Sequence, residues 1–185
     1  FILIDNREGV FKGDKVAFVQ KWCRRRFGIG SDGLIFIEKS EKADFNMDFY
    51  NPDGSQSFCG NGSRCAVAFA KYLGILNQKT TFEAIDGLHE AELVADNVKI
   101  GMHQFGEIEE VGADHFIDTG SPHYISYCEE NDTRDIVVYG RQIRYSERYA
   151  EKGTNVNLIK KIGDQHIAVR TYERGVENEE ASIIK

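Results

Sequence analysis

The chain has 185 residues, of which 41% are hydrophobic and 29% are charged, as in an ordinary folded domain. This length can bury a substantial core, either in one domain or in two small ones. With 30 acidic residues against 23 lysines and arginines, the net charge of −7 argues against nucleic acid as the main partner.

No stretch reaches the length of a membrane span and no signal-peptide pattern is present, so we expect a cytoplasmic protein without a membrane partner. The four cysteines contain no C-x-x-C pair, which indicates reduced thiols. Cys59 and Cys65 are about 240° apart around a helix, and the histidines form no H-x-x-x-H pair. We therefore expect no metal site.

Two helices are predicted in the first half of the chain. Asp14 can cap the first, which runs to about Phe27 with its apolar side chains on one stripe. The second runs from about Asn61 to Leu73 and is apolar nearly all round, which indicates an enclosed helix. Asn61 is a favourable N-cap for this second helix.

Runs of alternating or continuous apolar residues predict the strands. In the first half of the chain they are 34–37, 45–50, 81–84, 89–93 and 98–102. In the second half they are 115–118, 136–139, 156–160 and 167–172. The pattern indicates an N-terminal unit (1–105), an acidic linker (106–114) and a similar C-terminal unit (115–185) that lacks the helix of the first.

The string Gly28-Ile-Gly-Ser-Asp-Gly33 matches the G-x-G-x-x-G pattern of dinucleotide sites. Such sites need a strand before the glycines and a helix after them. Here a predicted helix precedes the glycines and the strand 34–37 follows. The string therefore predicts a tight helix-to-strand turn.

The most informative segment is a polar turn followed by Cys59-Gly-Asn-Gly-Ser-Arg-Cys65 at the head of the second helix. It places a thiol at the positive end of a helix, where a thiolate is stabilised. The exposed N–H groups of the first turn can hold an anion beside it. A buried structural cysteine, the common alternative, would not need Gly60 and Gly62, which permit close backbone approach. We interpret Cys59 as a reactive thiol and Cys65 as structural.

Two later motifs are less specific when taken alone. His123 lies in Asp118-Thr-Gly-Ser-Pro-His, a rigid turn at a strand end, and fits a structural and a catalytic role equally. Glu173-Arg174-Gly175 closes the last predicted strand, where a surface turn with a local ion pair is the simplest interpretation.

Taken together, these blocks resemble the diaminopimelate epimerase family. The cysteine segment, preceded by Asn51-x-Asp-Gly-Ser, carries the resemblance, which extends over nearly the whole chain. The other matching blocks are Phe1-Ile-Leu-Ile-Asp, Gly28-Ile-Gly-Ser-Asp-Gly, Asp118-Thr-Gly-Ser-Pro-His, Asn155-Val-Asn and Tyr172-Glu-Arg-Gly175.

The resemblance implies an α/β (α+β) fold of two pseudo-symmetric units. Each would be a curved mixed or antiparallel sheet wrapped around a central helix, with the active site in the cleft between the units. It implies epimerisation of LL-2,6-diaminopimelate to the meso form, in lysine and peptidoglycan-precursor biosynthesis, without a metal or other cofactor. A homodimer is an expectation from the family alone.

The resemblance also implies roles for individual residues. Cys59 would be one of two cysteines flanking the substrate α-carbon, one removing a proton and the other delivering one. Gly60 and Asn61 would offer N–H groups to the α-carboxylate. The remaining implied site residues are Asn51, Asn155 and Arg174 at the distal end of the substrate, Glu173 and His123 around the reacting centre, and Ser121.

The sequence departs from the family pattern in ways that matter for function. The second catalytic cysteine of the family lies in a C-G-T-G segment after Glu-Arg-Gly, at the start of the second central helix, and this sequence has no such segment. Ser121 stands where many relatives have asparagine, so its contact with substrate stays open. We expect that a further segment carries the second cysteine, and sequencing the complete reading frame tests this.

Two alternatives remain open at this point. One is a proline or hydroxyproline racemase of the same fold, although those enzymes usually have histidine where Asn61 stands. The other is a catalytically inactive binding homologue, supported by the absent second cysteine.

Overall fold

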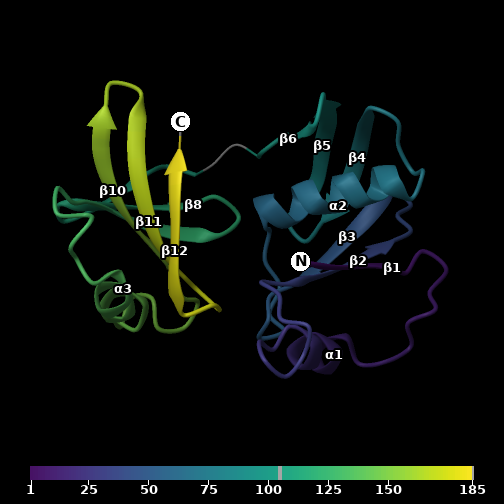
Figure 1. Cartoon of the computed structure of the whole chain (residues 1–185), viewed down its shortest axis with the longest axis horizontal. Helices are drawn as coiled ribbons and strands as arrows, with labels where there is room; N and C mark the ends of the chain where they lie inside the picture. The colour runs from purple at the N-terminus through teal and green to yellow at the C-terminus, as the bar shows by residue number, and fades with distance from the viewer. Residues whose placement is uncertain (104–105, 185) are drawn as a thin grey trace. The chain divides into compact units, whose positions relative to one another are not determined.

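The computed structural model describes residues 1–103 and 106–184. The chain forms two compact units, Phe1–His103 and Gln104–Lys185, which Figure 1 shows in purple to teal and in green to yellow. Each unit contains a six-stranded mixed sheet with at least one helix packed on it. The α+β class with two related units, expected from the sequence, is confirmed.

The sheet of the first unit has its strands in chain order. They are β1 (Ile2–Asp5), β2 (Leu34–Glu38), β3 (Phe45–Tyr50), β4 (Lys79–Ala84), β5 (Gly87–Val94) and β6 (Asn97–Ile100). Helix α1 (Lys15–Trp22) joins the parallel pair β1 and β2, and helix α2 (Gly60–Tyr72) joins the parallel pair β3 and β4. The other neighbours are antiparallel.

Strand β2 is buried on both faces, which explains its continuous apolar sequence. Ile35 and Ile37 belong to the cluster formed with α2, whereas Leu34 and Phe36 pack with Val19 of α1. Because successive side chains of a strand point to opposite faces, the two helices cover opposite faces of this sheet. Helix α2 packs against β2, β3 and β6. Figure 1 shows it lying across the sheet of the first unit.

The sheet of the second unit has the order β12-β11-β10-β9-β8-β7. Its strands are β7 (Glu109–Val111), β8 (Asp114–Asp118), β9 (Pro122–Tyr127), β10 (Asn155–Gly163), β11 (His166–Glu173) and β12 (Asn178–Ile184). Helix α3 (Ile136–Arg144) joins the parallel pair β9 and β10 and packs against β10 and β11. Strand β7, within the segment interpreted as a linker, pairs with β8.

The predicted strand 136–139 is wrong, because these residues form the first turn of α3. The carboxylate of Asp135 caps the helix by accepting hydrogen bonds from the N–H groups of Val137 and Val138, both at 3.0 Å. β-branched residues favoured the strand interpretation, and the cap and the burial of Ile136 on the sheet overrode it.

Helix α3 also corrects the expectation that the second unit has no helix. The succession β9-α3-β10-β11 has parallel and then antiparallel pairing, as both β1-α1-β2-β3 and β3-α2-β4-β5 do, so α3 is a crossover helix of the same kind as α1 and α2. After β11, the described residues 174–184 form a turn and strand β12. Strands β1, β7, β9 and β12 were not predicted, since they are short, polar or weakly alternating.

The first helix ends at Trp22 rather than Phe27, and the glycine string then forms the predicted helix-to-strand turn. The N–H of Gly30 donates to the carbonyl of Trp22 at 3.1 Å, and Gly30 has a φ of +80°. A Cβ on Gly28 would lie 2.5 Å from the carbonyl oxygen of Lys21, so only glycine fits there. Across the described residues, no helix is long and apolar enough to span a membrane.

We predict that Gly140→Ala destabilises the second unit, although alanine normally favours a helix. An added Cβ would lie 2.3 Å from Cγ of the fully buried Tyr172, so α3 would have to move off the sheet. We expect a loss of about 1–3 kcal/mol in the free energy of unfolding by urea. Val138→Ala, on the exposed side of the same helix, is the control; an unchanged or higher stability in Gly140→Ala would contradict the packing described.

Candidate active site

The first group of predicted site residues lies at the N-terminus of α2. Cys59 is the N-cap: its backbone is extended (φ −131°, ψ 105°), and its Sγ accepts a hydrogen bond from the N–H of Gly62 at 3.3 Å. Asn61, predicted as the cap, instead lies inside the first turn, so that prediction is wrong. The sulfur replaces the usual Asn or Ser oxygen as the group that accepts from the first turn.

The surroundings of Cys59 hold its backbone in place. Its carbonyl accepts from both the N–H and the Oγ of Ser63, each at 2.8 Å. The N–H groups of Gly60 and Asn61, the first of the helix, have no carbonyl in a preceding turn to bind. The half-buried thiol and these two N–H groups therefore lie at the same positive helix end, where a carboxylate can bind.

The polar turn before Cys59 is closed by Asn51. Its Nδ2 donates to Ser55 Oγ at 3.1 Å and to Ser57 Oγ at 3.2 Å, and its backbone N–H donates to the Ser55 carbonyl at 2.8 Å. Gly54, with a φ of +88°, supplies the left-handed residue of the turn. Asn51 is thus held at the start of the turn, eight residues before Cys59, with its amide nitrogen used within the turn.

The second group of predicted residues lies at one edge of the second sheet. In the parallel pair β9 and β10, His123 is opposite Asn155, and in the antiparallel pair β10 and β11, Val156 is opposite Tyr172. The starts of β9 and β10 therefore meet the end of β11, whose last residue is Glu173 and which Arg174 follows. This register brings together His123 and Arg174, which are 51 positions apart in the chain.

Asn155 links the residues at this edge of the sheet by hydrogen bonds. It is 8% exposed, its Nδ2 donates to Ser121 Oγ at 3.2 Å, and its Oδ1 accepts from the backbone N–H of Arg174 at 2.8 Å. The Arg174 guanidinium donates to the carbonyl of Lys152 at 2.7 Å. Gly153 permits this approach, because a Cβ there would lie 2.6 Å from Arg174 Cδ.

His123 is linked to a residue that the sequence analysis missed. Asn157 Nδ2 lies 3.2 Å from His123 Nδ1 and donates to the Tyr124 carbonyl at 3.0 Å, while Asn157 Oδ1 accepts from Thr171 at 2.9 Å. Asn157 follows Asn155 by two positions and so points to the same face, which was the available signal. A donating Asn157 amide requires Nδ1 of a neutral His123 to accept.

Burial lowers the pKa of His123 below its ordinary value of 6.5, and the positive charge of Arg174 acts in the same direction. The negative charge of Asp118 opposes this shift without cancelling it. His123 is therefore neutral at neutral pH and suited to accept or relay a proton.

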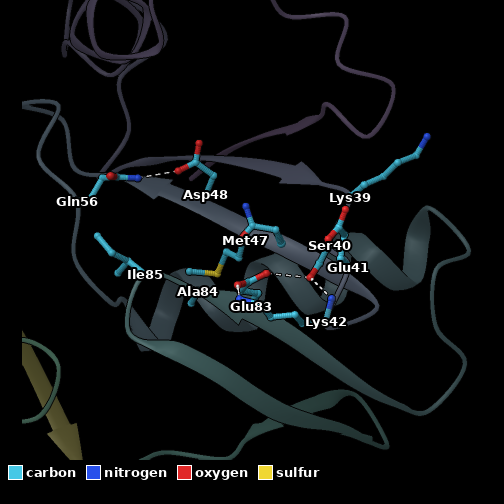
Figure 2. Close-up of a pocket in the computed structure, with 11 residues that line it drawn as sticks. Lys39, Ser40, Glu41, Lys42, Met47, Asp48, Gln56, Glu83, Ala84 and Ile85 are labelled. Atoms are coloured by element: carbon cyan, nitrogen blue, oxygen red, sulfur yellow. Dashed lines mark hydrogen bonds and ion pairs between the residues drawn. The ribbon is translucent and has the colours of Figure 1, made fainter.

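A separate depression lies on the first unit and holds none of the predicted site residues (Figure 2). It has a volume of about 390 Å³ and is open to solvent. Its polar side chains bind one another: Ser40 Oγ donates to Glu83 at 2.9 Å, and Gln56 donates to Asp48 at 2.6 Å. These groups offer little to a ligand, so the depression is not the candidate site.

We predict that the His123 ring titrates below pH 6.5 in an NMR titration of the folded protein. Because the folded pKa is below the unfolded one, His123 stabilises the fold above pH 6.5, and this contribution is lost as the pH falls below that value. Asn157→Asp should raise the pKa by placing a carboxylate at Nδ1. A midpoint at or above that of an unfolded-chain histidine would contradict the burial described.

Comparison with known proteins places this geometry in a family. Residues 1–109 match the family model described as diaminopimelate epimerase. The diaminopimelate epimerase of Flavobacterium psychrophilum is 46% identical over 98% of this chain and 72% of its own length. That of Chlorobaculum tepidum is 43% identical over 97% of this chain and 73% of its own.

Solved structures support the fold. A phenazine biosynthesis protein of the PhzF family from Bacillus anthracis has a TM-score of 0.61 at 13% identity, over 95% of this chain and 66% of that chain. One from Enterococcus faecalis has a TM-score of 0.59 at 14% identity, over 96% of this chain and 68% of that chain. Sequence identity to the curated epimerases is much higher than to these solved structures. By that match the chain belongs to the diaminopimelate epimerase family of isomerases.

Proposed function

We propose that this protein interconverts LL- and meso-2,6-diaminopimelate by proton transfer at the α-carbon, with Cys59 as one of the two bases. The observation that carries the proposal is the position of Cys59 Sγ at the N-terminus of α2, where it accepts the Gly62 N–H at 3.3 Å. Curated relatives named diaminopimelate epimerase support this choice of substrate. In this role the protein would serve lysine and peptidoglycan-precursor synthesis.

The chemical step needs a strong local positive potential, because an amino-acid α-proton is a very weak acid. The Cys59 thiolate takes the proton, and the electrons of the broken C–H bond remain on the α-carbon and its carboxylate. The N–H groups of Gly60 and Asn61 bind that carboxylate and stabilise the charge as it develops. This arrangement supports a reaction in which the protein itself supplies the stabilisation.

Residues of the second unit would bind and tune the substrate. Arg174 supplies a cation for the distal carboxylate, held by the Asn155 side chain through its backbone N–H. A neutral His123 and the Glu173 carboxylate would adjust the protonation of the substrate ammonium groups. Ser121, which receives the Asn155 amide, would position rather than bind.

Reprotonation on the opposite face of the α-carbon needs a second acid, and we propose a second cysteine. The other three cysteines do not fit this role: Cys23 and Cys128 are buried in the cores of their units, and Cys65 lies inside α2. The sequence has no cysteine after Cys128, whereas the family pattern places one after the equivalent of Glu173-Arg174-Gly175.

We predict that Cys59→Ser lowers the rate of epimerisation by at least about 10²-fold without unfolding the protein. Serine is a good N-cap, so α2 should keep its stability, whereas a hydroxyl is a much weaker acid than a thiol. The measurement is α-deuterium incorporation into LL-diaminopimelate in D2O by the complete gene product. Cys65→Ser is the matched control and should retain activity.

The outcomes separate the alternatives. Exchange into L-proline but not diaminopimelate would identify a racemase of the same fold, and exchange into neither would contradict both enzymatic assignments. Epimerisation that survives Cys59→Ser would overturn the assignment of the base.

A further inference from the structure

Three side chains of residue types that can bind a metal ion meet in the first unit, apart from the predicted site residues. Asp86 lies in the turn between β4 and β5, His89 lies on β5, and His103 follows β6. One ring nitrogen of each histidine and a carboxylate oxygen of Asp86 lie within 4.8 Å of one another. They come from a turn, a strand and a strand end, so no short sequence motif marks them.

The ring of His89 faces two hydrogen-bond acceptors. Its side chain is 1% exposed, its Nδ1 lies 3.1 Å from the Gly101 carbonyl oxygen, and its Nε2 lies 2.9 Å from Asp86 Oδ1. A carbonyl oxygen only accepts, so Nδ1 carries a proton and donates to Gly101. An ionised carboxylate also only accepts, so the contact between Nε2 and Asp86 needs a positive partner, which is either a second proton or a cation.

The adjacent His103 favours the cation. Its ring centroid lies 4.3 Å from that of His89, and both His103 and Asp86 are exposed, which leaves a path from solvent. A second proton on His89 would satisfy only the contact with Asp86, whereas a metal ion would bind Nε2, Asp86 and His103 together.

We propose that Asp86, His89 and His103 bind a divalent transition-metal ion of the zinc type. Two imidazoles and a carboxylate suit Zn²⁺, whereas Mg²⁺ and Ca²⁺ prefer oxygen ligands. The donation from Nδ1 to a backbone carbonyl is the usual way in which a ligating histidine is oriented. Rotation of the exposed His103 side chain brings its ring nitrogen into the coordination sphere, and water supplies the remaining ligand.

The consequence of binding is structural. His89 stacks on Phe58 at 4.4 Å between ring centroids, and Phe58 immediately precedes Cys59. An ion at His89 would therefore tie the turn between β4 and β5 to the segment that leads into α2. Because it binds the folded state, it should raise the melting temperature.

The experiment is a Zn²⁺ titration of metal-free protein, with thiols blocked by iodoacetamide and a chromophoric chelator as competitor. We expect one equivalent per chain, an increase in melting temperature with Zn²⁺, and affinity weakened more than about tenfold in Asp86→Asn and in His103→Ala. His166→Ala, an exposed histidine on β11, is the matched control and should bind as the parent does. Both variants change exposed side chains, and circular dichroism of the metal-free forms verifies that they fold.

A Co²⁺ titration identifies the ligands. Nitrogen and oxygen ligation should give visible d–d bands without the near-ultraviolet bands of thiolate ligation, and these bands should disappear in His103→Ala. The proposal is overturned if one equivalent of Zn²⁺ does not bind, or if binding is unaffected by both Asp86→Asn and His103→Ala. The contact of His89 with Asp86 would then be an imidazolium–carboxylate pair.

Discussion

The packing of α2 on its sheet is the constraint on which the candidate chemistry depends. The helix connects two parallel strands, β3 and β4, and buries Ala66, Val67 and Ala70 against the core. Small side chains let the helix approach the sheet closely, and its N-terminus is then held where β3 and the polar turn end. The reactivity proposed for Cys59 follows from this position, because the helix dipole and the free N–H groups exist only at the helix end.

In the second unit, the pairing of strands holds the candidate site residues in position at one edge of the sheet. Parallel pairing of β9 with β10 and antiparallel pairing of β10 with β11 place Asn155 between His123 and the turn that carries Arg174. The amide of Asn155 uses both its donor and its acceptor for this purpose. A buried asparagine whose amide donor and acceptor are both hydrogen-bonded restricts the backbone around it. The backbone of Arg174, from which the charged side chain extends, is therefore held in a defined position.

The differences between the sequence analysis and the structure come from rules that consider only neighbouring residues. The sequence analysis tested for metal ligands by their spacing along a helix, and such spacing does not detect side chains, such as Asp86, His89 and His103, that the folded sheet brings together. Strand propensity misassigned 136–139, because the cap at Asp135 and the packing of Gly140 on Tyr172 decide that segment. The sequence analysis did not single out Asn157, although it lies on the same strand face as Asn155. Its importance comes from its contact with His123, which only the folded sheet creates.

The sequence by itself determined the family, the position of Cys59 at the head of a helix and most strands of the two sheets. These features can be recognised from neighbouring residues, because short motifs, glycines beside a thiol and apolar periodicity are all local properties of the sequence. The tertiary structure alone decided that Cys59 rather than Asn61 caps α2, that residues 136–144 form a helix, and which distant side chains surround His123 and His89. Those features depend on strand register and on burial, and both arise only when segments far apart in the chain pack together.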